Sequence, residues 1–430
     1  MRSRHHRILE MTARRFDVGV DSGMLRNRIE DRALDDPYIT IDGRPLVNFG
    51  SAAYLALGRD PRLKAAAIDA VERYGTAYSS SIAYTSLPYY PLLEDKLQKI
   101  FDAPVVLAQT TTLIHLAVLP VAIAPEDHVL VDAHAHSSLN LAATVVKGTG
   151  AAVETLPHND VATLRRRLIE LTPSGRRIWY LADGVYSMLG DLAPAREAVQ
   201  LLDEFPALHC YFDDAHGLGW QGLHGRGTVL HQVPWHERLI VAGGLSKSFG
   251  ALGAVAAFGD AALAWRVQAC GGPVTFSGPI QPAALGAAIA SADIHLSDEH
   301  SVRQARLLGQ IDVVRSRLSE LRLPVLSLAT SPIWFIRIGG VARVIELLRR
   351  LRAEGYYLNP STFPMVPIGY AGVRFSQTLH HSDEHIHGLL DALGRHVPDL
   401  ADGTDITIDL TDEGITPSAI RNKKADGVVG

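Results

Sequence analysis

The sequence predicts an α/β protein whose seven-stranded, mostly parallel sheet is covered by helices on both faces. From residue 104 onward, short apolar runs alternate with helical segments, which is the order expected of β-α-β units. The runs are almost wholly apolar, as in strands buried on both sides. Polar side chains follow five of them. Since ligands of such sheets bind beyond the carboxyl ends of the strands, we expect a site at that edge.

Composition indicates a large globular protein and argues against some partners. The chain has 430 residues, 47% of them hydrophobic and 20% charged, with a net charge of −5. This size suits one large and one small domain. The slight acidity gives no reason to expect nucleic acid or an anionic membrane as a partner.

The sequence also lacks several marks of secretion, membrane insertion and metal binding. The basic segment 2–7 precedes no apolar run of a signal peptide, and Pro120 interrupts the longest apolar stretch, Leu116–Ala124. Cys210 and Cys270 are too few for a disulfide framework or a metal centre. Cys210 lies in a strand pattern and is interpreted as inert core. We therefore expect a cytosolic protein without a metal site.

The first part of the chain is predicted to be an arm followed by two helices. Residues 1–45 are polar and rich in arginine with weak periodicity, so we expect an arm that packs on another surface. Ile39–Asp42 and Pro45–Phe49 are expected to be short strands. Pro61–Tyr74 carries apolar side chains on one face and predicts a helix. A second amphipathic helix runs through Leu92 to Ile100.

The middle of the chain supplies the sheet. The predicted strands are Pro104–Ala108, His128–Val131, Ala151–Leu156, Arg177–Ala182, Leu208–Phe212, Leu239–Ala242 and Ala254–Phe258. Helices between them include Ala162–Leu171 and Pro194–Phe205. A long helical stretch, Ala283 to about Leu321, leads out of this domain.

The last part predicts a smaller α+β domain and a tail. Its expected elements are the strands Ser331–Ile338 and Gly372–Gln377 and the helices Val341–Ala353 and Asp383–Leu393. We predict an arm over residues 1–45, a large cofactor-binding domain over 46–300, a small domain over 301–400 and a mobile tail over 401–430.

Five polar clusters follow five strands, and Lys247 is the side chain that gives them a common interpretation. The clusters are Thr110–Thr112, Asp132–His136, Asp183–Ser187, Asp213–His216 and Ser246–Lys247. Partial desolvation of Lys247 on its glycine- and serine-rich turn would favour the neutral amine, which can form a Schiff base with a carbonyl. The alternative is a surface lysine on a turn.

The other clusters carry groups that suit pyridoxal phosphate. Asp213 follows a buried strand and needs a cationic partner, for which a protonated pyridine nitrogen would serve. His136 and His216 offer a ring face and a hydrogen-bond donor, and Ser187 offers a hydroxyl. With Lys247 for the Schiff base, this set meets the requirements of pyridoxal phosphate.

Several of the polar residues also have purely structural interpretations. Asp214 is expected to be a solvated neighbour or a helix cap, and His134 a bystander. His115 lies within an apolar helical pattern and is expected to be a satisfied core residue. His380–His381 is expected on a loop, and Arg374 could be a surface arginine of a strand.

The sequence resembles the α-oxoamine synthases among the fold-type I pyridoxal-phosphate enzymes. This family includes 8-amino-7-oxononanoate synthase, 5-aminolevulinate synthase and serine palmitoyltransferase. The resemblance covers roughly residues 45–395, in order. It rests on VNFGSAAYLALGRDPRL, HAHSSL, LPHND, DGVYSMLGDLAP, YFDDAHGLGWQGLHGRG, GGLSKSFGALGA and LNPSTFPMVPIGYAGVRFSQTLHH.

The resemblance implies a role for each matching residue, with pyridoxal 5′-phosphate as cofactor. Lys247 is similar to the Schiff-base lysine, and Asp213 to the partner of the pyridine nitrogen. His136 matches the histidine that stacks on the ring, and Ser187 and His216 match residues that contact the phenolic oxygen. In the last motif, Arg374 matches the arginine that binds the substrate carboxylate.

The reaction implied is the condensation of an amino acid with an acyl thioester, carried by coenzyme A or a carrier protein. The cofactor forms a quinonoid from the amino acid, which attacks the thioester with loss of carbon dioxide; Lys247, Asp213, His136 and His216 are the implied catalytic residues. The family is typically a homodimer. Alternatives are transamination, aldol-type cleavage, carbon–carbon bond formation without a thioester, and a silent partner subunit, against which Lys247 argues because such partners lack the lysine.

Three departures from the family concern the phosphate and the substrate. Thr110-Thr111-Thr112 stands where the family has a Ser/Thr-Gly-aromatic turn, and Gly244 stands where a Thr or Ser contacts the phosphate. Ser246 is the candidate to compensate. Ile82 replaces the arginine of a loop on the substrate side. These changes favour a specialised biosynthetic enzyme.

Overall fold

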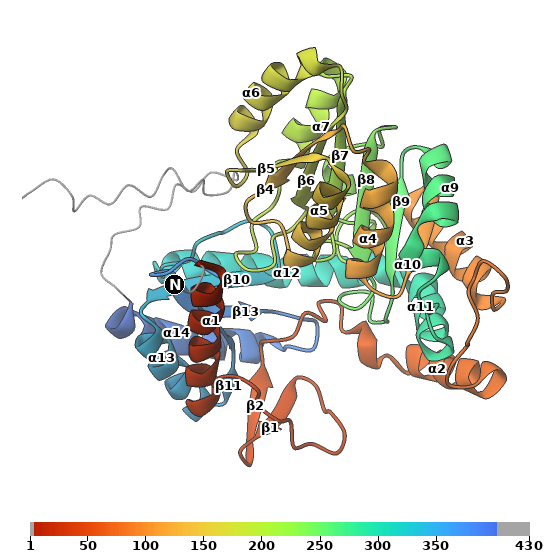
Figure 1. The fold of residues 1–430 in the computed structure, drawn as a ribbon. Coiled ribbons are helices and arrows are strands. Elements are labelled where there is room, and N and C mark those ends of the chain that lie inside the picture. The colour runs from red at the N-terminus through yellow and green to blue at the C-terminus, as the bar shows by residue number, and fades with distance from the viewer. Residues whose placement is uncertain (1–3, 402–430) are drawn as a thin grey trace, which may run out of the picture. The chain divides into compact units, whose positions relative to one another are not determined.

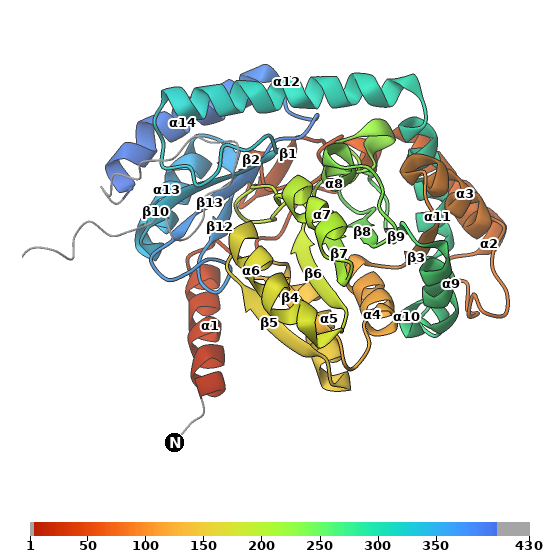
Figure 2. The same cartoon turned by 90° about the horizontal axis from the view of Figure 1, so that it is seen from above.

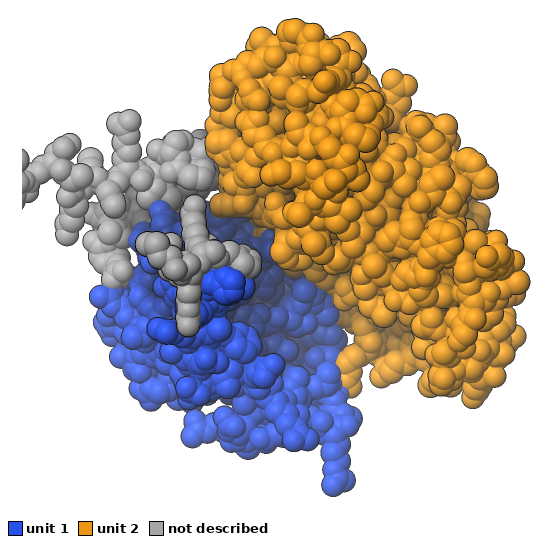
Figure 3. Space-filling model, viewed as in Figure 1, with its two compact units in different colours: residues 1–54, 187–191, 305–408 blue, residues 55–186, 192–304, 409–430 orange. Residues whose placement is uncertain are grey.

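The computed structural model describes residues 4–401, so that the predicted tail lies outside this range from residue 402 on. The chain forms two compact units, which Figure 3 colours separately. Within the described residues, the first comprises residues 4–54, 187–191 and 305–401, and the second comprises residues 55–186 and 192–304. Each unit is described by itself. The domain boundaries expected from the sequence stay a prediction.

The second unit contains the predicted seven-stranded sheet (Figure 1). Its strands are β3 (Val105–Ala108), β4 (His128–Asp132), β5 (Ala152–Leu156), β6 (Ile178–Asp183), β7 (Leu208–Asp213), β8 (Leu239–Gly244) and β9 (Ala254–Phe258). They lie in the order β3-β9-β8-β7-β6-β4-β5. Only β9 is antiparallel to its neighbours, so the mostly parallel sheet is confirmed.

Helices cover both faces of this sheet (Figure 2). Successive side chains of a strand point to opposite faces, so the strands contribute to two hydrophobic cores. One hydrophobic core involves α3 (Tyr89–Phe101), α6 (Val161–Leu171), α7 (Ala195–Glu204), α8 (Thr228–Gln232) and α11 (Pro282–His295). The other involves α4 (Thr111–Ala122), α5 (Ser137–Thr149), α9 (Ala261–Cys270) and α10 (Gly272–Thr275). In β7, Cys210 and Phe212 face the first core and Tyr211 the second.

The structure agrees with the interpretation of Cys210 as inert core. Its side chain is fully buried, and burial raises the pKa of the thiol to about 12. Among the helices of residues 4–401, none is long and apolar enough to cross a membrane.

The predicted long helix after residue 283 is in fact two helices. α11 ends at His295, and α12 (Asp298–Glu320) begins three residues later. The Ser297 hydroxyl donates to the carbonyl of Ile294, within the last turn of α11. Such a side-chain bond offers the backbone an alternative to continuing the helix. Residues 297–301 are all polar, and Asp298 and Glu299 stand in the first turn of α12, so the sequence did contain a signal for a second helix start.

The first unit holds two small sheets and the C-terminal helices. Its strands are β1 (Tyr38–Ile41), β2 (Arg44–Asn48), β10 (Ile333–Gly339), β11 (Tyr356–Tyr357), β12 (Asn359–Ser361) and β13 (Ala371–Ser376), in the orders β1-β2-β11 and β10-β13-β12. Helices α13 (Val341–Ala353) and α14 (Asp383–Leu400) complete it. His380 and His381 lie on the loop between β13 and α14, as predicted.

The prediction for residues 1–45 missed a helix, α1 (Arg4–Asp21). From Leu9 to Asp21 no side chain is buried, and Leu9 and Phe16 are 53% and 44% exposed. Apolar side chains do recur at helical spacing along α1, so the periodicity of this segment is stronger than the prediction from the sequence assumed. The remaining helix, α2 (Pro61–Tyr74), has the bounds expected from the sequence.

His381 in the first unit must be uncharged for its contacts to form. Its Nδ1 accepts from the amide of Thr378 at 3.0 Å, and its Nε2 donates to the carbonyl of Asn48 at 3.1 Å. The ring stacks on Phe49 with centroids 4.0 Å apart. Burial lowers the pKa of His381 to about 3. A proton on Nδ1 would break the bond to Thr378.

This histidine should make folding sensitive to acid. Its folded-state pKa lies below the unfolded value of about 6.5, so its contribution is complete above pH 6.5 and is lost as the pH falls toward 3. Between pH 7 and pH 5 the loss should be about 2 kcal/mol. Urea unfolding gives the free energy of unfolding at pH 7 and at pH 5. The decrease in this free energy from pH 7 to pH 5 should be about 2 kcal/mol smaller in His381→Gln than in the wild type. Equal drops would contradict the prediction.

Candidate active site

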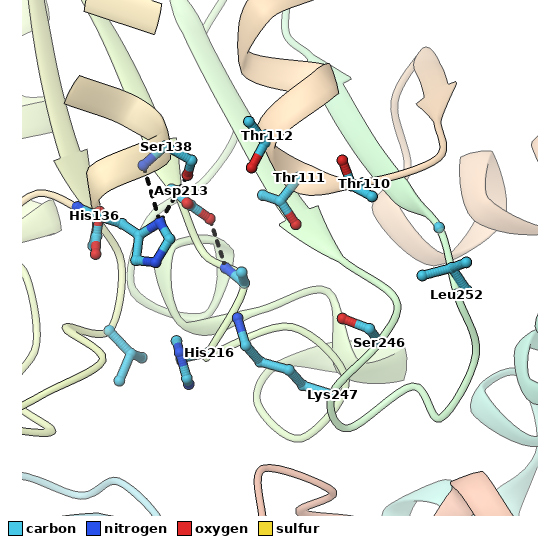
Figure 4. A pocket seen from close by; sticks show the side chains of 14 residues that line it. Thr110, Thr111, Thr112, His136, Ser138, Asp213, His216, Ser246, Lys247 and Leu252 are labelled. Atoms are coloured by element: carbon cyan, nitrogen blue, oxygen red, sulfur yellow. Dashed lines mark hydrogen bonds between the residues drawn. The ribbon is translucent and has the colours of Figure 1, made fainter. Parts of the chain in front are cut away.

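A pocket of about 180 Å³ lies at the carboxyl ends of the strands in the second unit (Figure 4). Every one of the five predicted polar clusters contributes to its wall. The lining residues are Thr110, Thr111, Thr112, His136, Ser138, Asp183, Val185, Asp213, Ala215, His216, Ser246, Lys247, Leu252 and Gly253. The site expected at this edge of the sheet is thus a single cavity.

Lys247 reaches the pocket from the turn after β8. In Figure 4 its amine points toward Asp213 and His136. Gly250, which has a φ of +74°, closes the turn with a bond from its amide to the carbonyl of Lys247. A Cβ at Gly250 would lie 2.6 Å from the amide nitrogen of Gly58. Only glycine fits there, so the backbone around Lys247 is tightly defined.

Asp213 is a buried carboxylate held in its ionised form. Its Oδ1 accepts from the amide of Ala215 at 3.1 Å, and its Oδ2 lies 2.9 Å from Nε2 of His115. Burial by itself would raise the pKa of Asp213, but His115, Lys247 and the Ala215 amide outweigh burial, so the pKa lies below its ordinary value. A buried anion of this kind is well placed to bind a cationic ring nitrogen.

A second carboxyl group in the pocket has the opposite charge state. Asp183, at the end of β6, accepts from the amide of His136 at 3.0 Å. Burial, and then the nearby Asp213, raise the pKa of Asp183 well above its usual range. The surroundings therefore shift the pKa values of the two carboxyl groups of the pocket in opposite directions.

His136 presents an uncharged ring to the pocket. It is the N-cap of α5, and its Nδ1 lies 2.7 Å from the hydroxyl of Ser138 and accepts from the Ser138 amide at 3.3 Å. Desolvation lowers the pKa of His136. With Nδ1 as acceptor, the hydrogen of the neutral ring lies on Nε2. A neutral, flat ring fixed at its edge can stack on an aromatic cofactor.

The opposite wall carries hydroxyl groups at a helix N-terminus. Thr110 caps the twelve-residue helix α4, with its Oγ1 accepting from the amide of Leu113 at 3.3 Å. Thr111, Thr112 and Ser246 add three more hydroxyl groups to this side. Hydroxyl groups and free amides at the positive end of a helix suit a phosphate.

Gly244 and Thr111, which belong to two of the departures from the family, lie next to each other. A Cβ built on Gly244 would lie 2.6 Å from Oγ1 of Thr111. The Thr111 hydroxyl thus lies where a side chain at position 244 would begin. Gly244 makes room for Thr111, and Thr111 rather than Ser246 is the group that takes up the space.

This donor set fits pyridoxal 5′-phosphate. The pocket supplies an amine for the aldehyde, an ionised carboxylate for the ring nitrogen, a neutral imidazole for the ring face and hydroxyl groups for the phosphate. His216 also lines the pocket and can contact the phenolic oxygen.

Ser187 and Arg374 lie in the other compact unit, where they contact each other. Nε of Arg374 donates to the carbonyl of Ser187 at 2.6 Å. Arg374 is 9% exposed on β13, so the interpretation as a surface arginine is wrong. Burial raises the pKa of the neighbouring Tyr54 to about 12, although Arg374 acts to lower it. Tyr54 therefore stays protonated beside the guanidinium.

Three structural interpretations need correction or extension. Asp214 is 1% exposed, so it is not solvated, but it accepts from the amide of Val229 at 2.9 Å in the first turn of α8, which agrees with the expected helix cap. His134 stacks on His158 with ring centroids 3.9 Å apart and is not among the pocket residues. His115 is buried, as expected, but its partner is Asp213.

Sequence reasoning missed this role of His115. The available signal was its spacing: it follows Thr111 by four residues, on the helix that begins at the hydroxyl wall. Asp183 was placed in a polar cluster but was not selected as a site residue.

Comparisons with known proteins agree with this site. A family model described as aminotransferase class I and II matches residues 44–393. The chain is 32% identical over 377 residues to 8-amino-7-oxononanoate synthase of Symbiobacterium thermophilum, covering 87% of this chain and 94% of that protein. It is 30% identical over 355 residues to serine palmitoyltransferase of Bacteriovorax stolpii, covering 82% and 83%.

Solved structures share the fold. Serine palmitoyltransferase of Sphingomonas wittichii matches with a TM-score of 0.83 at 23% identity, over 93% of this chain and 100% of that one. An 8-amino-7-oxononanoate synthase from Francisella tularensis matches with a TM-score of 0.69 at 20% identity, over 82% and 98%.

The chain belongs to the aminotransferase class I and II family. Its cofactor is pyridoxal 5′-phosphate, and its curated relatives place it among the acyltransferases known as α-oxoamine synthases. The predicted fold class, family resemblance and cofactor are confirmed.

The link between Gly244 and Thr111 can be tested through cofactor affinity. Gly244→Ser forces the Thr111 hydroxyl to move, so we expect the Kd for pyridoxal phosphate to rise by about tenfold or more. Adding Thr111→Ala opens the space and lets the new serine supply a hydroxyl, so the double variant should recover most of the affinity. Absorbance titration measures both. A single variant that binds like the wild type would contradict the link.

Proposed function

We propose that this enzyme condenses an amino acid with an acyl thioester of coenzyme A or a carrier protein and releases the amino acid's carboxyl group as carbon dioxide. One observation carries the proposal. The amine of Lys247 points toward the buried, ionised Asp213 in a pocket whose far wall carries hydroxyl groups. The relatives named above support the choice of an acyltransferase.

The cofactor, when bound, supplies an electron sink for the Cα of the amino acid. Lys247 is assigned two tasks: it holds the cofactor covalently, and as a free amine it removes the Cα proton. Asp213 accepts the hydrogen bond of the ring nitrogen and keeps that nitrogen protonated. His136 would stack on the ring face, limit the movement of the ring and shield Cα from water.

Further residues are assigned to the remaining cofactor atoms. Ser187 and His216 are proposed to contact the phenolic oxygen. The phosphate is assigned to Thr110, Thr111, Thr112 and Ser246, which together offer four hydroxyl groups and the amides at the start of α4.

Arg374 is assigned to the carboxylate of the amino acid, which a guanidinium can bind with two parallel hydrogen bonds. The bond from its Nε to Ser187 fixes one edge of the group. The protonated Tyr54 adds no negative charge beside it. The positive charge of Arg374 therefore remains available for a substrate anion.

Ile82 bears on the choice of substrate. It packs against both hydrophobic cores of its unit, in the loop where the family has an arginine, which favours an unusual acyl donor and specialised biosynthesis.

We also propose a cytosolic homodimer. Tyr84 and Phe276 are 84% and 83% exposed, as expected of side chains that a second copy covers. Light scattering should give twice the 46.6 kDa of the chain.

The reaction can be tested with amino acids labelled at the carboxyl carbon. Enzyme loaded with pyridoxal phosphate is screened with these amino acids, with and without acyl-coenzyme A. We expect labelled carbon dioxide only when the thioester is present, and a loss of more than about 10³-fold in Lys247→Ala. Keto-acid formation without the thioester would instead indicate an aminotransferase and contradict the proposal.

The same assay tests Arg374. Arg374→Lys keeps the charge but loses the planar fork, so KM for the amino acid should rise about tenfold while KM for the thioester stays the same. The matched control is Arg337→Lys. Arg337 lies on the neighbouring strand β10 and packs over the ring of Tyr370, so its replacement should change neither constant. An unchanged KM in Arg374→Lys would remove the assignment.

A further inference from the structure

His115 links the core of the protein to the charge at the pocket. It is fully buried in α4, and both of its ring nitrogens are engaged. Nδ1 lies 2.6 Å from the hydroxyl of Tyr211, and Nε2 lies 2.9 Å from Oδ2 of Asp213. No other group within hydrogen-bond distance of its ring is described in residues 4–401.

Two hydrogen bonds connect Tyr211, His115 and Asp213 in that order. An ionised carboxylate can only accept, so Nε2 of His115 carries the hydrogen toward Asp213. Nδ1 of His115 shares a hydrogen with the hydroxyl of Tyr211. Burial, and then Asp213, raise the pKa of Tyr211 well above its usual range, so the phenol keeps its proton.

The fold explains why these three residues meet. Tyr211 and Asp213 are two apart in β7 and point to the same face of the sheet. That face is the one covered by α4. His115 lies four residues after Thr111 on α4, and residues at this spacing lie on the same side of a helix. One rigid helix therefore carries both a hydroxyl of the proposed phosphate wall and the partner of Asp213, about 6 Å apart along its axis.

We propose that His115 is a positioning residue of the cofactor site, which holds Asp213 ionised and oriented toward the ring nitrogen, with Tyr211 orienting His115 in turn. The proposal rests on the assignment of pyridoxal phosphate to this pocket. Through α4, the positions of the phosphate wall and of the carboxylate are set by a single element. Hydrogen bonds in a buried chain of this kind strengthen one another.

A role in core packing alone makes different predictions. A packing residue can be replaced by an apolar side chain of similar size without altering the charge of Asp213. A positioning residue cannot, because a buried carboxylate that loses its donor binds a proton more readily. A protonated Asp213 would no longer keep the ring nitrogen of the cofactor protonated. The protonation state of that nitrogen is therefore the quantity to measure.

The test loads the enzyme with pyridoxal phosphate labelled with ¹⁵N in the ring and records its nitrogen resonance. His115→Leu removes the donor, whereas His115→Gln keeps an N–H near the same place. Tyr211→Phe removes only the phenolic hydroxyl. The matched control is Tyr180→Phe, since Tyr180 is a buried tyrosine of the adjacent strand β6 that packs on Phe212 rather than on His115. Circular dichroism and Tm report on folding.

In the wild type, His115→Gln and Tyr180→Phe, we expect the ¹⁵N resonance in the range of a protonated ring nitrogen. In His115→Leu, it should shift toward the range of an unprotonated ring nitrogen. Tyr211→Phe should shift partway. The Kd for the cofactor should rise about tenfold in His115→Leu. A wild-type resonance in Tyr211→Phe, or in a folded His115→Leu, overturns the proposal, as does an equal shift in Tyr180→Phe. Failure of the wild type to bind the cofactor would overturn the cofactor assignment itself.

Discussion

The site depends on one constraint: a carboxylate with almost no exposure to water must stay ionised. Asp213 meets it with hydrogen bonds from His115 and the Ala215 amide and with the nearby charge of Lys247. A protonated ring nitrogen would add a further cation beside this buried carboxylate, which suits the chemistry of pyridoxal phosphate.

Two neighbouring carboxyl groups show how closely charge is controlled here. Burial raises the pKa of Asp214 to about 8, so the residue next to Asp213 is largely protonated at neutral pH. Glycines surround Asp214, and a Cβ at Gly217 or Gly227 would lie 2.1 Å or 2.3 Å from its carboxyl oxygens. Asp214 thus anchors the loop that carries His216, while Asp213 is the carboxylate that we assign to the ring nitrogen. Two adjacent, chemically identical side chains therefore have different tasks because the strand directs them into different surroundings.

Much of the fold could be read from the sequence, and the exceptions have physical causes. Most of the strands were predictable because strands buried on both faces are continuously apolar, and the polar residues at their ends stand out; β5, at the edge of the sheet, is partly exposed and contains Glu154 and Thr155. Lys247, Asp213 and His136 were recognisable for that reason. His115 was not, because a single histidine in an apolar helix gives no sign of which buried group it contacts. Helix α1 was missed although its apolar side chains recur at helical spacing, and the break near Ser297 was missed although the polar residues 297–301 mark it.

The central claim is that Lys247 holds the cofactor in this pocket, and covalent trapping tests it directly. Reduction of the loaded enzyme with borohydride makes the bond between lysine and cofactor permanent, and mass spectrometry of the peptides then locates it. The account predicts a phosphopyridoxyl group on Lys247, and its loss in Lys247→Ala. A group found instead on any other lysine of the chain, or on no lysine at all, would contradict the account.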